Sequence, residues 1–76
     1  MFGYIHYTFR LNIGPDELLR VYQGSAKKLR VRCNEGPVVE LDASHLKQFT
    51  TADGIAGSFI LTTTAEHKFV SLNRAD

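Results

Sequence analysis

The sequence predicts a small α+β domain: a curled antiparallel sheet or partly open barrel of about five strands, with one helix after the first strand. Apolar and polar residues alternate along residues 5–13 and 29–33, which is the period of a strand with one buried face. After Gly14-Pro15, apolar residues recur at the spacing of one face of a helix. The chain has 76 residues, enough for one hydrophobic core, so we expect a single domain over residues 1–76.

The first strand and the helix after it have the clearest patterns. The residues expected on the buried face of the strand are Ile5, Tyr7, Phe9, Leu11 and Ile13. Pro15 suits the first helical position because its φ is already helical and it needs no N–H partner. The apolar stripe of the helix consists of Leu18, Leu19, Val21 and Tyr22. We expect Gly24 to end the helix in the left-handed conformation that glycine adopts easily.

A β-hairpin is predicted next. Leu29, Val31 and Cys33 alternate with three cations, and residues 34–37 (Asn-Glu-Gly-Pro) have the composition of a turn. Residues 38–41 then form a short third strand. Because Pro37 cannot donate a backbone hydrogen bond, it should lie at a strand start or on an edge.

The rest of the chain predicts a short helical turn and two more strands. Asp42 or Ser44 could cap a 3₁₀ or α turn that carries Leu46 and Phe49 inward. Residues 55–63 have strand spacing after an Asp-Gly turn, and Gly57 indicates a bulge or bend. Residues 68–73 form the last strand, in which apolar residues occur on both faces.

The chain resembles a family of short bacterial proteins known as domain of unknown function 2835. The resemblance covers nearly the whole chain. Its more specific elements are Tyr22-Gln23-Gly24 and Gly54-Ile55-x-Gly57-x-Phe59, supported by Leu46-x-x-Phe49 and Phe69-Val70-Ser71-Leu72. The family has no assigned activity, substrate or catalytic residue. The resemblance therefore supports the single-domain expectation and implies no function.

Composition excludes some classes of protein and favours others. Nine Lys and Arg against eight Asp and Glu give a net charge of +1, too close to neutral to attract nucleic acid or anionic lipid except through a local patch. No apolar run is long enough for a membrane span, so we expect no membrane association. One cysteine and no visible export signal favour the cytoplasm.

The residues that commonly perform catalysis or bind metals are scattered. His6, Cys33, His45 and His67 fall in four segments, without the close ligand pairs that are typical of metal sites. Arg32 should point away from Cys33 across the strand, so that thiol is expected to be buried and inert. We therefore expect no catalytic residue, no metal and no cofactor, and a protein that is not an enzyme.

The most usable polar feature is the stripe formed by Lys28, Arg30 and Arg32. Side chains two residues apart on a strand project from one face about 7 Å apart, close to phosphate spacing. The stripe could bind a nucleic-acid backbone. The alternative is an ordinary solvated sheet face whose charge is balanced by Glu40 across the hairpin, and we weigh this explanation more heavily.

We favour a small non-enzymatic binding or protein-interaction domain, with nucleic-acid binding as the second hypothesis. A small sheet has edges that must be covered or paired, and a domain of this size gains stability from association. The partner could be another protein or a second copy in a homodimer. Apolar residues expected opposite the core, and so candidates for a contact patch, are Phe2, Tyr4, Ile60 and Val70.

Overall fold

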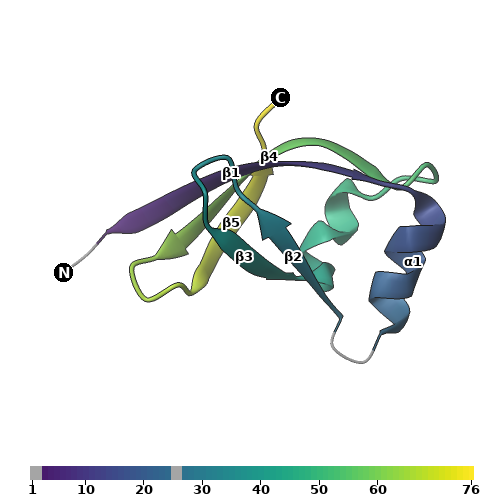
Figure 1. The fold of residues 1–76 in the computed structure, drawn as a ribbon, viewed down its shortest axis with the longest axis horizontal. Helices are drawn as coiled ribbons and strands as arrows, with labels where there is room; N and C mark the ends of the chain where they lie inside the picture. The colour runs from purple at the N-terminus through teal and green to yellow at the C-terminus, as the bar shows by residue number, and fades with distance from the viewer. Residues whose placement is uncertain (1–2, 25–26) are drawn as a thin grey trace.

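The computed structural model describes residues 3–24 and 27–76. The elements are β1 (Tyr4–Ile13), α1 (Pro15–Gln23), β2 (Lys28–Arg32), β3 (Val38–Asp42), the 3₁₀ helix η1 (Ala43–Phe49), β4 (Ile55–Thr64) and β5 (Phe69–Arg74), as drawn in Figure 1. The predicted order of strands, with one α-helix after the first, is confirmed. None of the helices within the described residues is long and apolar enough to cross a membrane.

The strands form two antiparallel sheets, not the single curled sheet that was expected. One sheet has the order β1-β4-β5, and the other is the β2-β3 hairpin. Strands β1 and β4 pair along their whole length, from Tyr4 opposite Thr64 to Ile13 opposite Ile55. The expectation of a single sheet was therefore wrong. The strands also do not close into a barrel.

The hairpin is attached to the larger sheet through its turn. The N–H of Asn34 donates to the carbonyl of Thr8 at 2.7 Å. The Glu35 carboxylate accepts from the Thr8 N–H at 2.9 Å and from its hydroxyl at 2.6 Å. These bonds hold the Glu35 pKa below its ordinary value, the hydroxyl bond contributing most. Among the described residues, only the turn of the hairpin forms hydrogen bonds to β1, so β2 does not continue the sheet.

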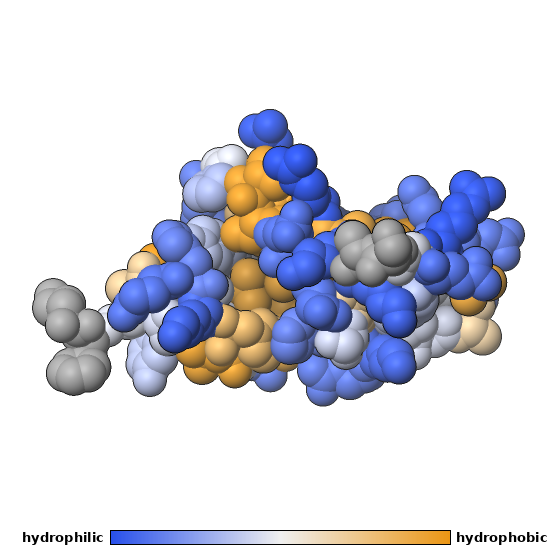
Figure 2. Space-filling view, turned by 90° about the horizontal axis from the view of Figure 1, so that it is seen from below, coloured by the Kyte–Doolittle hydropathy of each residue, from blue (hydrophilic) through white to orange (hydrophobic). Residues whose placement is uncertain are grey.

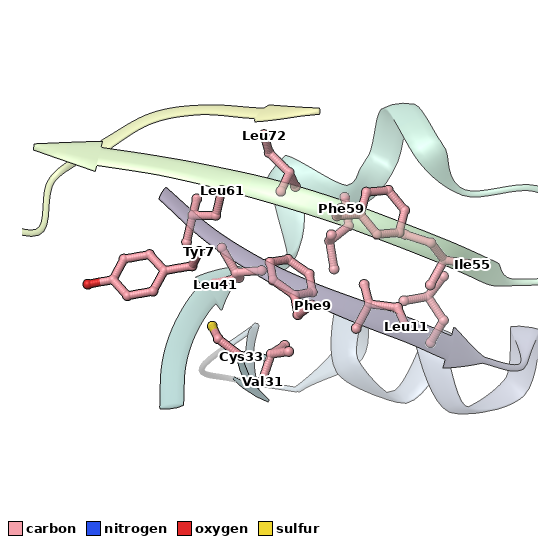
Figure 3. Packing of buried hydrophobic residues seen from close by; sticks show 12 residues of the cluster. Tyr7, Phe9, Leu11, Val31, Cys33, Leu41, Ile55, Phe59, Leu61 and Leu72 are labelled. Atoms are coloured by element: carbon pink, nitrogen blue, oxygen red, sulfur yellow. The ribbon is translucent and has the colours of Figure 1, made fainter. Parts of the chain in front are cut away.

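The core lies between the two sheets and is completed by α1 and η1. Its largest fully buried side chains are Phe9, Phe59, Leu18, Leu46 and Ile55. Figure 3 shows Val31 and Cys33 of the hairpin facing the side chains of β1 and β4. The predicted alternation along β1 and β2 is confirmed, because Tyr7, Phe9, Leu11, Val31 and Cys33 are all buried.

The ends of the two helices follow from local chemistry, with one correction. Gly24 is extended, with φ −67°, so the predicted left-handed cap was wrong; its N–H instead donates to the carbonyls of Arg20 and Val21. The predicted turn after β3 is confirmed as η1. The Asp42 carboxylate accepts from the Ser44 N–H at 3.0 Å, which caps the first turn of η1.

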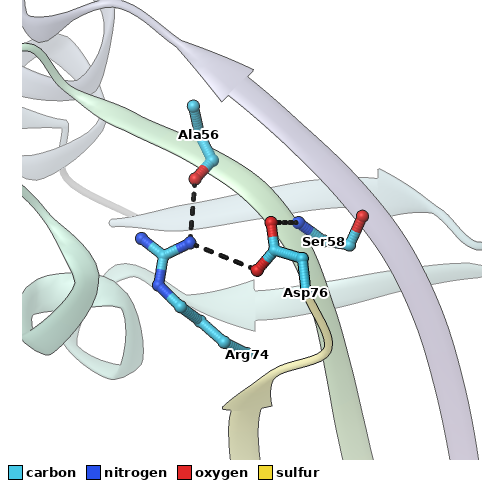
Figure 4. A network of polar contacts seen from close by, with 4 residues as sticks. All are labelled: Ala56, Ser58, Arg74 and Asp76. Atoms are coloured by element: carbon cyan, nitrogen blue, oxygen red, sulfur yellow. Dashed lines mark hydrogen bonds and ion pairs between the residues drawn. The ribbon is translucent and has the colours of Figure 1, made fainter.

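Arg74 and Asp76 form a network of polar contacts with the backbone of β4 (Figure 4). The Arg74 guanidinium lies over the Phe59 ring at 5.1 Å and donates to the Ala56 carbonyl at 3.1 Å. It also pairs with Asp76 at 3.6 Å, and the other oxygen of that carboxylate accepts from the Ser58 N–H at 3.1 Å. The Ser58 bond is the main reason that the Asp76 pKa is lowered. These polar groups therefore lie beside the apolar interior at Phe59.

Candidate functional site

The predicted basic stripe lies on the outward face of β2. Lys28, Arg30 and Arg32 are all exposed, as the alternation predicted. Their partners across the hairpin are Asp42, Glu40 and Val38 respectively. The Lys28 ammonium also lies 3.9 Å from the Glu40 carboxylate. Acidic groups therefore stand among the cations, and only Arg30 and Arg32 make no ion pair with another described residue.

The cysteine and the histidines do not converge on one site. Cys33 is buried, and burial is the main cause of a raised thiol pKa, with a smaller contribution from the Glu35 charge. Its thiol therefore stays protonated and is a poor nucleophile. His6 contacts the Thr62 hydroxyl at 2.9 Å, and His45 stacks on Phe69. Residues 3–24 and 27–76 contain no group of three or more His, Cys, Asp or Glu side chains that could hold a metal ion.

A groove runs along β3 on the side opposite β2. It consists of two adjoining cavities of about 370 and 300 Å³, which share Glu40, Leu61, Thr63 and His67. We call this feature the β3 groove. The first cavity is bordered by Tyr7 and the start of β3, and the second by the end of β3, His45 and Phe69. The groove therefore lies between one strand of the hairpin and the connection from β4 to β5.

The backbone of β3 is unpaired on the groove side. Within the hairpin, Cys33 donates to the Pro37 carbonyl and Ala43 to the Lys27 carbonyl, both at 2.8 Å. Because antiparallel pairs alternate between bonded and non-bonded positions, residues 38, 40 and 42 direct their N–H and C=O groups away from β2. β2 is the only strand that pairs with β3 among the residues that the structure describes. β3 is therefore an open edge.

Apolar side chains are exposed on both parts of the groove. Val38 is 47% exposed in the first cavity, and Phe69 is 42% exposed in the second. The Phe69 ring is held by His45, whose ring lies parallel to it with the centroids 3.8 Å apart. Figure 2, which views the molecule from below, shows a strip of hydrophobic surface between polar margins. The groove therefore exposes apolar side chains beside the buried residues Tyr7 and Leu61.

The second cavity has more charged groups than the first, although Glu40 lines both. Glu40 and Asp42 contribute two carboxylates, and Lys28 contributes one ammonium group. The Asp42 pKa is lowered, chiefly by hydrogen bonds from Ser44 and less by the charges of Lys28 and His45. Asp42 is therefore ionised at neutral pH. The carboxylates of this cavity outnumber its ammonium group by one.

Sequence reasoning identified some exposed apolar residues and missed the groove. Tyr4 and Val70 are exposed, at 67% and 43%, and Ile60 is partly exposed, as expected. Phe2 lies outside the described residues. Two adjacent apolar pairs, Val38-Val39 and Phe69-Val70, were the available signal, because neighbours on a strand face opposite sides and one of each pair cannot reach the same core.

The comparisons with known proteins identify a family and nothing closer. No curated protein and no solved structure matches the chain. The model of a family described as "Protein of unknown function (DUF2835)" matches residues 5–75. That match extends from Ile5, the second residue of β1, to beyond the end of β5. The chain therefore belongs to the DUF2835 family of proteins of unknown function.

Proposed function

We propose that this protein is a non-enzymatic interaction module that binds an extended segment of a partner protein along the β3 groove. The observation that carries the proposal is the open edge of β3 beside a groove with exposed apolar side chains. Unpaired strand edges bind extended peptides by adding a strand, with main-chain hydrogen bonds giving affinity and alternate side chains giving specificity.

The dimensions of the groove suit a short strand. β3 has five residues, from Val38 to Asp42, so a paired segment of similar length would span about 17 Å. The N–H and C=O groups of Val38 and Glu40 are directed outward for such pairing. Leu61 and Tyr7 form apolar walls beneath it. Main-chain pairing and side-chain burial would thus occur together.

The chemistry of the groove favours binding over catalysis. Its Thr63 hydroxyl donates to the Thr64 carbonyl at 3.0 Å and is not paired with a base. Asp42 has a lowered pKa, whereas a carboxylate acting as a general acid or base near neutral pH needs a raised one. His45 is stacked on Phe69. These features support a recognition surface.

A partner of different sequence is favoured over a second copy. Antiparallel pairing of two β3 edges about a two-fold axis at Glu40 would place that carboxylate opposite its own copy. The same pairing would bring two Asp42 carboxylates into the joined sheet. Like charges directly opposite one another on neighbouring strands are destabilising. A homodimer through β3 is therefore the less favoured arrangement.

Glu40→Pro is expected to weaken peptide binding by about tenfold or more, because it removes an outward N–H and places a ring on the edge. The Glu40 N–H is not part of the ladder with β2, so the hairpin itself should survive. Glu40→Thr is the matched control, since it removes the carboxylate and keeps the donor. Decapeptides selected from a random display library with the wild-type protein supply the probe, and titration calorimetry gives the affinities.

Two results would contradict the proposal. One is that the library yields no peptide that binds the wild-type protein. The other is that Glu40→Pro and Glu40→Thr weaken binding equally while both keep the wild-type melting temperature. Light scattering on the same samples tests self-association: a wild-type dimer that Glu40→Pro dissociates would identify a second copy as the partner.

A second candidate function is nucleic-acid binding through Lys28, Arg30 and Arg32. Its support is that Arg30 and Arg32 are exposed side by side and make no ion pair with the described residues. Replacing both arginines with Ala is expected to weaken binding of a single-stranded or duplex oligonucleotide and to flatten its salt dependence. Gel shifts at several salt concentrations measure this. Absence of a wild-type shift at low salt would eliminate the candidate.

We also propose the cytoplasm as the place of action. Cys33 is a buried free thiol in a fold without a disulfide among its described residues. A reducing compartment suits such a protein, because small extracellular domains usually depend on disulfides. Fractionation followed by detection of the protein tests this placement, and recovery from an extracellular fraction would contradict it.

A further inference from the structure

His67 has a backbone conformation that glycine normally supplies. In the turn from β4 to β5, the His67 N–H donates to the Thr64 carbonyl and the Thr64 N–H donates to the Lys68 carbonyl, both at 2.9 Å. This turn places His67 in the left-handed region, at φ 68°. Residues with a Cβ are strained there, whereas glycine is not. Of the described residues with positive φ, three are glycines, and only Lys27 and His67 are not. Position 67 therefore keeps a side chain despite the strain.

His67 lies on the β3 groove. It lines both cavities of the groove, as Glu40 and Leu61 also do. Because the groove lies between β3 and the turn that carries His67, a segment that pairs with β3 and fills either cavity meets a wall that includes this residue. The strained position is therefore at the place where the partner is expected to bind.

The three histidine rings differ in what they contact. A ring nitrogen of His6 lies 2.9 Å from the Thr62 hydroxyl, and the His45 ring stacks on Phe69. Among residues 3–24 and 27–76, the His67 ring makes no hydrogen bond, ion pair or aromatic contact. A neutral imidazole has one donor and one acceptor nitrogen, so it can bond to either kind of group. The His67 ring is therefore available to a bound molecule.

We propose, resting on the function proposed above, that His67 is a binding residue of the β3 groove whose imidazole forms a hydrogen bond to the extended segment paired with β3. The left-handed backbone holds the ring at the groove, where it adds a polar contact beside the apolar walls formed by Tyr7 and Leu61. Strain is retained at this turn because the side chain contacts the partner.

Two substitutions separate the ring from the backbone. His67→Gly removes the ring and relieves the strain, so it is expected to raise the melting temperature by roughly 2–6 °C. His67→Ala removes the ring and keeps the strain, so its melting temperature should stay close to that of the wild type. Both variants are expected to bind the decapeptides from the display library about three- to tenfold more weakly, the scale of one hydrogen bond. Thermal melts and titration calorimetry measure the two effects.

Lys27→Gly is the matched control. Lys27 also has a positive φ, 51°, but it lines neither cavity of the groove. Its replacement by glycine is expected to raise the melting temperature as His67→Gly does and to leave peptide affinity unchanged. The pair of glycine variants therefore distinguishes a contact with the peptide from a general effect of relieving strain.

The outcomes separate this inference from the proposed function. The Glu40 amide signal in ¹⁵N NMR reports whether the β3 edge is occupied. If peptides perturb that signal and bind His67→Gly and His67→Ala as tightly as the wild type, strand addition stands and the role of His67 is overturned. Equal losses of affinity in His67→Gly and Lys27→Gly, or a lower melting temperature for His67→Gly, also overturn it. If no peptide perturbs the Glu40 amide, both proposals fail.

Discussion

Phe59→Ala is expected to lower the free energy of unfolding by about 3–5 kcal/mol, the usual loss for a fully buried aromatic side chain. Phe59 has no exposed surface and lies opposite Phe9, with the ring centroids 6.1 Å apart. Phe49 meets the same ring edge-on at 5.0 Å, and Arg74 lies over it at 5.1 Å. Truncation would therefore remove the centre of the core and the platform for the guanidinium.

The loss expected for Phe59→Ala is large relative to the total free energy of unfolding. A chain of 76 residues typically has a stability of roughly 4–11 kcal/mol, so the variant should be close to half unfolded if the wild type lies at the lower end. Urea denaturation followed by circular dichroism measures the change. Ile60→Ala is the matched control, because Ile60 is the next residue of β4, points to the other face and is only partly buried. A comparable loss in both variants would contradict this description of the core.

The elements could be predicted from sequence because their signals are local. Alternation along β1 and β2 fixes which face is buried, whatever the strands pair with. The capping of η1 by Asp42 likewise depends on residues two apart. The division into two sheets could not be predicted, since it depends on Asn34 and Glu35 meeting Thr8, 26 and 27 positions away.

Less of the candidate site than of the fold could be predicted from the sequence. The stripe of Lys28, Arg30 and Arg32 was predicted on an exposed face and lies there. The β3 groove was missed, because it is lined by residues of all five strands, of η1 and of the turn between β4 and β5, which only the folded chain brings together. Glu40 was considered only as a charge balance across the hairpin, although its backbone faces an unpaired edge.

Gly54→Ala is expected to lower the free energy of unfolding by at least about 4 kcal/mol, among the largest effects of a single substitution. Gly54 has φ +99°, a conformation that L side chains rarely adopt. A Cβ added there would collide with the carbonyl oxygen of Ile13 and lie 2.9 Å from the carbonyl carbon of Gly14. Both are backbone atoms at the junction of β1 and α1, so neither can move aside without displacing an element.

Gly36→Ala separates conformational strain from collision. Gly36 has φ +115°, but nothing lies within 4 Å of a Cβ added to it, so its loss should be limited to strain of about 1–3 kcal/mol. Thermal melts of both variants measure the difference, and equal losses would show that the collision has no effect. Gly54 permits a close backbone approach, and Ile55 and Phe59 fill the core, so the segment from Gly54 to Phe59 owes its sequence to the packing of the fold.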